Sequence, residues 1–168
     1  MSPNAAGRSG IGTASTEQKR TFVRDIGADE AIDYGMEGWP NEVLKITGGR
    51  GVDIILESIG GTTFEKNFEC LSTFGRHIIF GSTRGPGQPV PPRRLMAKCQ
   101  SMTGIYLPVY FARPELIRKG LEEMVERFVN GSIRSHIAKI LPLSQVAEAH
   151  RLLEEQSVSG AIVLNPKE

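Results

Sequence analysis

Short apolar runs alternate with amphipathic segments along most of this chain, and the alternation predicts strands and helices in turn. The clearest run is residues 51–61, Gly-Val-Asp-Ile-Ile-Leu-Glu-Ser-Ile-Gly-Gly. Its β-branched centre is too short for a helix and is flanked by turn-forming residues. We expect a fully buried strand over 51–59 that runs directly into a glycine turn. In an open parallel sheet, ligands bind at the carboxyl ends of the strands, so this run also marks a place for a ligand.

The remaining segments complete an alternating order. Further strands are expected at 11–15, 30–34, 76–80, 101–107, 137–141 and 161–164, and helices at 17–26, 40–47, 62–71, 93–98, 114–130 and 143–155. Thr16 is expected to cap the first helix. Residues 84–92, rich in proline and glycine, predict an irregular loop. Strands that alternate with helices are typical of βαβ units, so the predicted fold class is α/β with a parallel sheet.

The apolar positions of two helices predict which side faces the core. The inward positions expected on helix 62–71 are Phe64, Phe68 and Leu71. Those expected on helix 114–130 are Leu116, Leu121, Met124, Val125 and Phe128.

Composition and charge exclude several classes of protein. The 168 residues, with 39% hydrophobic and 23% charged, suit one domain of ordinary soluble type. A net charge of +1 gives no electrostatic case for nucleic acid or an anionic membrane. No apolar stretch approaches the ~20 residues of a spanning helix, and the N-terminus lacks the apolar core of a secretory signal. We therefore expect a cytoplasmic location.

The cysteines and histidines do not predict a metal site. Cys70 and Cys99 are far apart in the sequence, and His77, His136 and His150 occur singly. Structural zinc requires about four such ligands, commonly in closely spaced pairs. We expect two buried thiols without a disulfide, three ordinary histidines and no bound metal.

Five segments occur in one characteristic order: IGTASTEQKR, IGADEAIDY, TGGRGVDIILESIGG, LSTFGRHIIFGSTRG and LSQVAEAHRLLEEQSVSGAIVLNP. In that order they resemble the medium-chain dehydrogenase/reductase superfamily, in its zinc-free quinone oxidoreductase branch. Members bind NADPH on a Rossmann domain and reduce quinones or activated double bonds, such as those of enals, by hydride transfer. The resemblance therefore implies a Rossmann-like, doubly wound, mostly parallel sheet with NADP(H) as cofactor.

One half of the implied cofactor site would hold the adenosine end. In the family the adenosine ribose lies at the end of the second strand, which corresponds to Ser15 and Thr16, with Lys19 and Tyr34 near the 2′-phosphate. A cation and a phenol can hold a phosphate dianion. No acidic residue occupies positions 13–16, whereas an NAD site tends to place one at this strand end. The alternative is that Lys19 is a solvated helix lysine and Tyr34 merely ends a strand.

The other half would hold the ribose and the nicotinamide. The residues that match the family there are Glu57, Ser58, Ile59 and Gly60, followed at the next strand end by Phe80, Gly81 and Ser82. A glycine at position 81 would let the cofactor approach the main chain closely. The alternative is ordinary strand-to-turn chemistry, with the acid and hydroxyls facing water. We nominate no catalytic residue, because a helix histidine such as His150 and a strand tyrosine such as Tyr106 are usually structural.

The chain departs from the family pattern at its beginning. A complete member starts with a catalytic domain of partly open β-barrel type, followed by the first Rossmann strand and a glycine-rich turn that holds the pyrophosphate. Gly7, Gly10 and Gly12 superficially look like that turn, but no apolar strand precedes them. We interpret 1–10 as a foreign or disordered leader, 11–135 as a partial Rossmann domain, and 136–168 as a tail that in the family rejoins the catalytic domain.

The first strand occupies a central place in the usual order 3-2-1-4-5-6. Its absence predicts a gap, a rearranged sheet or a swap between chains. Segment Ser101–Leu107 matches the sixth strand, an edge that relatives pair across a two-fold axis, so we expect a homodimer through it.

The sequence leaves two functions open. The first is the cofactor-binding portion of an NADPH-dependent oxidoreductase that reduces quinones or activated carbon–carbon double bonds. The second is a non-catalytic truncated fragment or oligomerisation module with weak or no nucleotide binding. A hydrolase is excluded because no GxSxG nucleophile elbow occurs.

Overall fold

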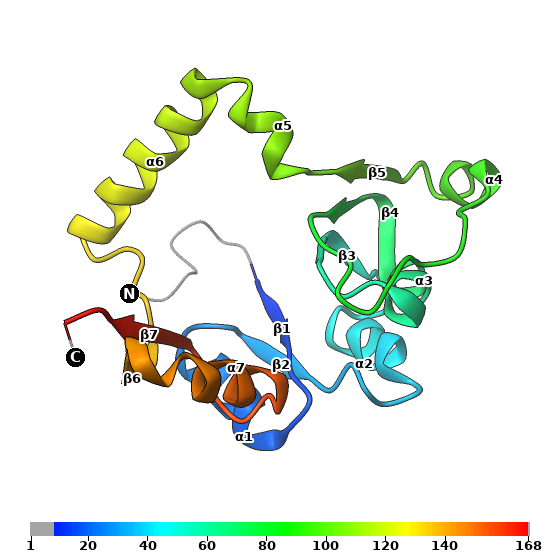
Figure 1. The fold of residues 1–168 in the computed structure, drawn as a ribbon. Coiled ribbons are helices and arrows are strands. Elements are labelled where there is room, and N and C mark those ends of the chain that lie inside the picture. Colours follow the sequence, from blue (N-terminus) through cyan, green and yellow to red (C-terminus); the bar gives the residue numbers. More distant parts are fainter. Residues whose placement is uncertain (1–8, 168) are drawn as a thin grey trace. The chain divides into compact units, whose positions relative to one another are not determined.

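The computed structural model describes residues 9–167, which divide after Ala112 into two compact units (Figure 1). The first unit contains β1 (Ile11–Thr13), α1 (Glu17–Asp25), β2 (Glu30–Ile32), α2 (Trp39–Ile46), β3 (Val52–Glu57), α3 (Gly61–Cys70), β4 (Leu71–Ile79), α4 (Pro92–Met96), β5 (Ser101–Gly104) and α5 (Leu107–Phe111). The second contains α6 (Pro114–Val129), β6 (Ile137–Pro142), the 3-10 turn η2 (Leu143–Gln145), α7 (Val146–Glu154) and β7 (Ala161–Asn165).

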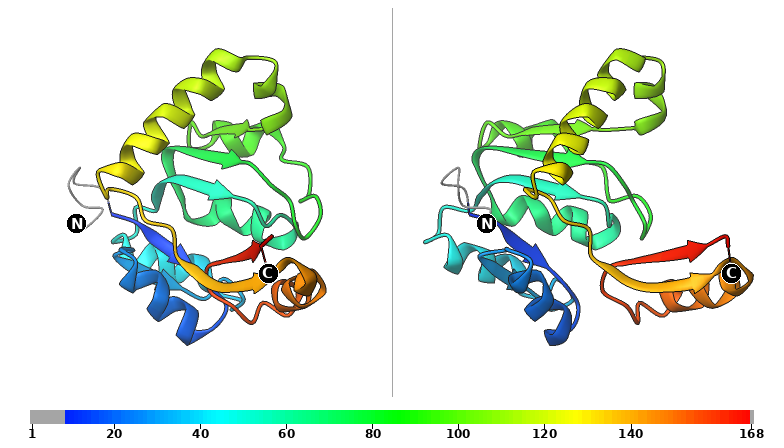
Figure 2. Two further views of the ribbon diagram at one scale, coloured as in Figure 1. Left: turned by 60° about the vertical axis from the view of Figure 1, so that its left-hand side comes forward. Right: turned by 90° about the vertical axis from the view of Figure 1, so that its left-hand side faces the viewer.

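Every strand pair in the described chain is parallel, as the alternating order predicts. β1 pairs with β2, and β3, β4 and β5 form a three-stranded sheet whose members lie side by side in Figure 2. In the doubly wound order, β2 and β1 correspond to the third and second strands, and β3 to β5 to the fourth, fifth and sixth. No strand of residues 9–167 lies between β1 and β3. The α/β prediction is confirmed, and the sheet is divided where the sequence predicts a gap.

Two apolar clusters hold the first unit together. Phe64 and Phe68 of α3 face the core as predicted and pack on Leu71, which was predicted on the same helix but is the first residue of β4. Trp39 and Val43 of α2 form a second cluster to which both β1 and β3 contribute. This shared cluster joins the two sheets from one side.

The second unit is a βαβ arrangement around a small core of its own. β6 and β7 pair in parallel, and α7 connects them. Leu141, Ala149 and Leu152 form the buried cluster. The predicted helix 143–155 is divided into η2 and α7.

The first strand segment is a strand and not a phosphate-binding turn. Gly12 pairs with Ala31 across the β1–β2 ladder, in agreement with the sequence interpretation. A Cβ at Gly12 would lie 2.2 Å from Cγ1 of Val23, so the missing side chain lets α1 approach β1. Gly7 and most of the predicted leader lie outside the described residues.

The predicted strand 101–107 is too long. β5 ends at Gly104, and Leu107 begins the short helix α5, which the sequence analysis did not identify. Pro108 stands in the first turn of α5, where its fixed φ favours a helix start. Ile105 still donates a hydrogen bond of 2.7 Å to the carbonyl of Ile79, so the ladder ends just before Tyr106.

The prediction that the 51–59 strand is fully buried is wrong. Ile54 is 43% exposed and Leu56 is 68% exposed, although both lie in the middle of β3. The physical reason is topological. β3 is an edge strand in the described chain, so its side chains lack a neighbouring strand on one side.

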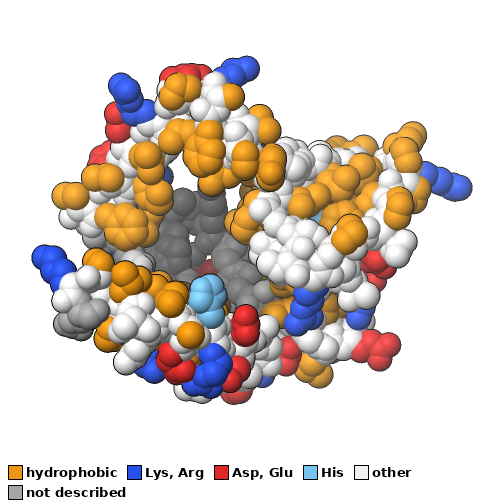
Figure 3. All heavy atoms as spheres, in the orientation of Figure 1, with side chains coloured by type: hydrophobic (Ala, Val, Ile, Leu, Met, Phe, Trp, Pro, Cys, Tyr) orange, Lys and Arg blue, Asp and Glu red, His pale blue; other side chains and the backbone are white. Residues whose placement is uncertain are grey.

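The prediction that the apolar side of α6 faces a core is also wrong. No residue of the helix is buried, and the exposed positions include Leu116, Leu121, Met124, Val125 and Phe128. Figure 3 shows apolar side chains gathered over α6. Helical periodicity established that the helix is amphipathic, but it could not show what covers the apolar side. Within residues 9–167, no helix is both long enough and apolar enough to cross a bilayer.

Candidate functional site

The carboxyl end of β3 is built around the buried carboxylate of Glu57, which is only 2% exposed. Oε1 accepts hydrogen bonds from the main-chain N–H groups of Ile59 and Gly60, the second at 2.9 Å. Oε2 accepts a hydrogen bond from Nδ2 of Asn67 on α3. A carboxylate with three donors is held in place, so Glu57 fixes the path of the turn that follows it.

A polar chain continues from Glu57 into the core. Nδ2 of Asn67 also lies 3.2 Å from Nε2 of His77, which is fully buried on β4 between Phe64 and Phe68. Because Asn67 is the donor, Nε2 of His77 accepts and Nδ1 carries the hydrogen, without a partner. Burial lowers the pKa of His77, and the charge of Glu57 opposes this only in part. The network therefore requires a neutral imidazole.

The turns after β3 and β4 are bonded to each other through their main chains. Thr83 and Arg84 donate N–H hydrogen bonds to the carbonyls of Ser58 and Ile59, at 3.1 and 2.7 Å, and Gly61 donates to Gly85 at 2.9 Å. The two turns therefore form one rigid edge.

Glycines make this contact between the turns possible. A Cβ at Gly60, where φ is 78°, would lie 2.2 Å from the carbonyl oxygen of Gly85. A Cβ at Gly81 would lie 3.1 Å from the carbonyl oxygen of Ser58. Both glycines thus serve the packing of the turns.

The start of α1 is capped as predicted. Oγ1 of Thr16 accepts a hydrogen bond of 3.3 Å from the N–H of Lys19, and Ser15 and Thr16 are exposed. Arg20 was not among the predicted site residues. It donates a hydrogen bond of 3.2 Å to the carbonyl of Ala14 and forms a 3.1 Å ion pair with Asp33. Arg20 therefore ties the end of β1 to the segment after β2.

A second cation lies beside Tyr34. The guanidinium of Arg84 is 5.5 Å from the centre of the Tyr34 ring, a cation–π contact between the segment after β2 and the turn after β4. Arg84 was not predicted as a site residue. The only sequence signal was its place in a loop that follows a strand's carboxyl end.

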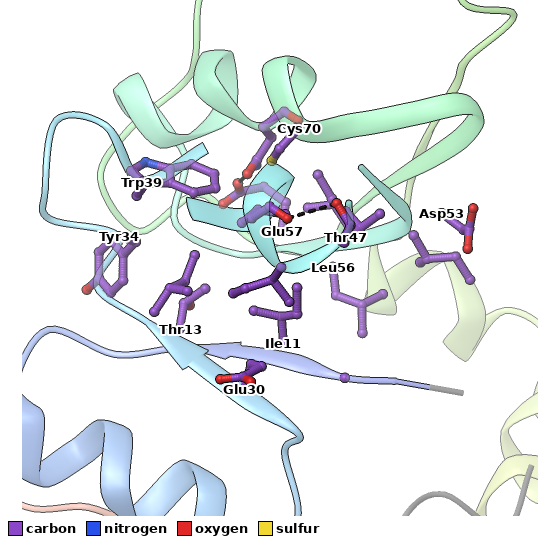
Figure 4. Close-up of a pocket in the computed structure, with 18 of the residues that line it drawn as sticks. Ile11, Thr13, Glu30, Tyr34, Trp39, Thr47, Asp53, Leu56, Glu57 and Cys70 are labelled. Carbon is purple, nitrogen blue, oxygen red and sulfur yellow. Dashed lines mark hydrogen bonds between the residues drawn. The ribbon is translucent and has the colours of Figure 1, made fainter. Parts of the chain in front are cut away.

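A pocket of about 890 Å³ lies between β1 and β3, and we call it the β1–β3 groove (Figure 4). Its walls include Ile11 and Thr13 from β1 and Ile54 and Leu56 from β3, and α2 contributes Trp39, Val43 and Ile46. Tyr34, Glu57, Ser58 and Ile59 line one end of it. The lining does not include the remaining predicted site residues, which are Ser15, Thr16, Lys19, Gly60, Phe80, Gly81 and Ser82.

The structure thus brings together the two predicted strand ends at Glu57–Gly60 and Phe80–Ser82 through direct hydrogen bonds. Phe80 donates its N–H to the carbonyl of Glu57 at 2.9 Å. Asn67 and His77, which support this edge from inside, could not be found from sequence, because nothing in the pattern of α3 or β4 indicates a polar contact across the core.

Comparison with known proteins gives the class of the protein. A sequence profile described as zinc-binding dehydrogenase matches residues 26–164, which is most of the chain. The chain therefore belongs to the zinc-binding dehydrogenase family, and the predicted resemblance to medium-chain dehydrogenases/reductases is confirmed. Residues 9–167 bring together no group of three or more His, Cys, Asp or Glu side chains suited to a metal ion.

Individual relatives agree with this class. A quinone oxidoreductase-like protein 2 homolog from Nematostella vectensis is 30% identical over all of this chain and 46% of its own length. A 2-haloacrylate reductase from a Burkholderia species is 30% identical over 94% of this chain and 48% of its own length. The crystal structure of Escherichia coli quinone oxidoreductase, complexed with NADPH, matches 97% of this chain and 51% of that chain with a TM-score of 0.85 and 29% identity. This chain spans about half the length of the relatives that it matches.

Proposed function

We propose that this chain is the cofactor-binding portion of an NADPH-dependent oxidoreductase that reduces quinones or activated carbon–carbon double bonds. The observation that carries the proposal is the rigid edge formed by the turns after β3 and β4, at the carboxyl ends of parallel strands. That edge occurs in a fold that matches an NADPH complex with a TM-score of 0.85. Ligands of open α/β sheets bind at such an edge.

The adenosine end of the cofactor is assigned to the start of α1. Ser15 and Thr16 are exposed there, and the helix N-terminus favours an anion. Lys19 and Tyr34 would hold the 2′-phosphate. Arg84, in contact with the Tyr34 ring, supports this assignment by adding a second cation.

The nicotinamide end is assigned to the rigid edge, which the buried side chain of Glu57 supports from the protein interior. Its carboxylate is occupied by Ile59, Gly60 and Asn67, so it would position the main chain of the turn for the cofactor. The predicted contacts there are completed by Ser58, Phe80, Gly81 and Ser82. When bound, a nicotinamide supplies or accepts the hydride. We assign no catalytic residue in this chain, and the division at 1–10, 11–135 and 136–168 stays a prediction.

Titration with NADPH, followed by energy transfer from Trp39, tests the proposal. Trp39 is the only tryptophan, it is buried, and it lies at the pocket that includes Tyr34 and Glu57. We expect saturable binding below about millimolar concentration, the range in which enzymes hold their substrates. No saturation, together with no quinone-dependent oxidation of NADPH, would contradict the proposal.

Lys19→Ala tests the 2′-phosphate assignment. The variant should raise the Kd for NADPH about tenfold, which corresponds to about 1.4 kcal/mol of binding free energy, and should leave the Kd for NADH unchanged. Lys45→Ala on α2 is the matched control, because Lys45 is an exposed helix lysine outside the proposed site. Equal loss of NADPH and NADH affinity in Lys19→Ala would refute the assignment.

The alternative function is a non-catalytic fragment or an oligomerisation module. It is favoured by the exposed apolar side chains of β3 and α6 and by the half-length match to relatives. Its expected signature is association of the chain without nucleotide binding. The NADPH titration separates the two functions.

We also propose that the chain forms a homodimer, and we limit the predicted interface Ser101–Leu107 to β5. The reaction is proposed to be zinc-independent, and the location is proposed to be cytoplasmic. Among the described residues, β5 is the free edge of its sheet, and Met102 on the strand and Ile105 directly after it are exposed. Cys70 and Cys99 are both free thiols, which is compatible with a reducing compartment. Cys70 is buried as predicted, but the prediction that Cys99 is buried is wrong, because its side chain is exposed. Size-exclusion chromatography should show a dimer that Met102→Lys converts to monomer, and a monomer in the unsubstituted chain would refute it.

A further inference from the structure

We propose that Asn67 and His77 are positioning residues for the cofactor, because they link the proton on the buried His77 imidazole to the geometry of the turn at residues 58–60. Their effect on NADPH rests on the proposed function, whereas the link inside the chain can be measured without nucleotide. The support comes from the hydrogen bonds of Asn67, the packing of His77 and the acceptor role of Glu57.

The amide group of Asn67 joins two buried titratable side chains through one nitrogen. Its Nδ2 donates to Oε2 of Glu57 and lies 3.2 Å from Nε2 of His77. The two hydrogens of a side-chain amide nitrogen serve these two acceptors, one each. Asn67 is 4% exposed, Glu57 is 2% exposed and His77 is fully buried, so bulk water does not replace either bond.

Packing alone does not explain a histidine at position 77, because its surroundings are aromatic. The imidazole stacks on Phe64 with the ring centres 5.1 Å apart, and it meets Phe68 in a T-shaped contact at 4.9 Å. Its Nδ1 is buried without a hydrogen-bond partner among the described residues, and such a group is destabilising. What the ring adds over an apolar side chain is the acceptor Nε2, which faces Asn67.

Protonation of His77 is incompatible with this arrangement. An imidazolium carries a hydrogen on both nitrogens, so Nε2 becomes a donor and faces the donor Nδ2 of Asn67. If the amide of Asn67 turns over, its Oδ1 accepts from Nε2 but also takes the place of the donor at Oε2 of Glu57. Asn67 can therefore satisfy a charged Glu57 or a charged His77, but not both. The proton is taken from solvent when the core opens locally.

The charges around the imidazole decide at which pH this change occurs. Burial lowers the pKa of His77, and the carboxylate of Glu57 opposes this only in part. On α4, Arg94 lies over the ring of Phe68, 5.0 Å from its centre, and its charge disfavours a second cation nearby. The residues opposite His77 on β3 and β5 are uncharged, and its chain neighbour Arg76 lies on the other face of the sheet. Protonation therefore begins below the ordinary histidine pKa of about 6.5.

Glu57 carries the change from the core to the turn. While Asn67 holds Oε2, the other oxygen, Oε1, accepts the N–H groups of Ile59 and Gly60. Loss of the Asn67 donor frees the carboxylate to rotate, so these two N–H groups lose a fixed acceptor. The carbonyl of Ile59 also accepts from Arg84 in the turn after β4, so both turns of the rigid edge respond together.

The first measurement is a pH titration of the full 168-residue chain by nuclear magnetic resonance, without nucleotide, between about pH 7.5 and 5. We expect the amide signals of Ile59 and Gly60 to shift at the same pH as the ring signals of His77. The control amide is that of Gly51 at the other end of β3, which donates to Oγ1 of Thr47 at 3.0 Å and should not follow His77. A His77 that stays neutral down to pH 5, or turn amides that ignore its titration, would overturn the proposal.

The second measurement is the Kd for NADPH over the same pH range, in the original chain and in His77→Gln. The 2′-phosphate itself titrates near pH 6, so the comparison of the two chains isolates the contribution of His77. A glutamine keeps a neutral acceptor for Asn67 but cannot be protonated. We expect the Kd of the original chain to rise about fivefold more than that of His77→Gln as the pH falls. Equal pH profiles would refute the role in cofactor binding.

A third comparison separates positioning from general stability. Asn67→Leu keeps the size of the side chain but removes both donors, so it should raise the Kd for NADPH about fivefold at pH 7.5 and abolish the link between the turn amides and His77. Leu71→Val is the matched control, because it weakens packing on Phe64 and Phe68 without removing a hydrogen bond of Glu57. Circular dichroism checks that each variant folds.

The outcomes distinguish this proposal from the proposed function. If the original chain does not bind NADPH at any pH, the proposed function fails and the role in cofactor binding fails with it, whatever the turn amides show. If NADPH binds but Asn67→Leu and Leu71→Val raise its Kd equally, the proposed function stands and Asn67 is refuted as a positioning residue.

Discussion

β3 and β4 are neighbouring strands of one sheet, yet the burial of their apolar side chains differs sharply. On β4, Leu71 is 1% exposed and His77 is fully buried. On β3, Leu56 is 68% exposed although it lies opposite Ile78 in the ladder. Over residues 76–79 β4 has a strand on each side, whereas within the described chain β3 has one on one side only. Burial of a strand residue is therefore decided by what lies beside it and over it. Leu71 packs on Phe64 and Phe68 of α3, whereas Phe74 of the same strand is 74% exposed.

The strongest test of this difference compares leucine truncations on the two strands. Leu71→Ala should lower the free energy of unfolding by about 2–5 kcal/mol, because it opens a cavity beside Phe64 and Phe68. Leu56→Ala should change it by less than about 0.5 kcal/mol, because the side chain is already largely in water. Urea unfolding measures both. Equal losses would show that β3 is as buried as β4 in solution.

The next test compares the two carboxylates of β3. Glu57→Gln should lower the free energy of unfolding by about 1.5–3 kcal/mol, because a neutral amide cannot accept all three hydrogen bonds of the buried carboxylate. Asp53→Asn is the control, since Asp53 is exposed and paired with Arg50 at the surface. Urea unfolding should detect only the first change, and a comparable effect at Asp53 would contradict the assigned role of Glu57.

A smaller effect is expected where the ends of the two strands meet. Gly60→Ala should destabilise the chain by about 1 kcal/mol or more, because φ is positive and the new Cβ would meet the carbonyl of Gly85. Gly104→Ala on β5 has open space around it and negative φ, so it serves as the control. Thermal unfolding of the two variants measures the difference. Similar melting temperatures would show that the two turns are not packed as the structure has them.

The smallest expected effect is the pH dependence of the free energy of unfolding. Because burial lowers the pKa of His77, the unfolded chain binds a proton more readily than the folded chain. The contribution of the neutral imidazole is complete above the ordinary histidine pKa of about 6.5 and is lost as pH falls below it. Urea unfolding between about pH 5 and 7 should therefore show stability rising with pH, and His77→Gln should flatten that rise. An unchanged slope in the variant would assign the pH dependence to other groups.

Local sequence signals predicted the elements well. The Thr16 cap and the helix that follows it are confirmed, as are the helix predicted at 40–47 and the strand and turn at 51–61. These features depend on contacts between residues that are only a few positions apart in the sequence. The strand at 101–107 was predicted too long, because Pro108 can follow a strand or open a helix, and the sequence alone did not decide between them.

The sequence by itself determined the α/β class, the parallel order and the relationship to medium-chain dehydrogenases/reductases. These follow from periodicity, turn residues and motif order. Only the tertiary structure decided that Glu57 is buried against Asn67, that Gly60 and Gly81 serve the packing of two turns, and that β3 remains exposed beside an apolar groove. The physical reason is that burial and hydrogen bonding depend on residues distant in sequence, and a strand's own pattern does not state whether a neighbour is there to cover it.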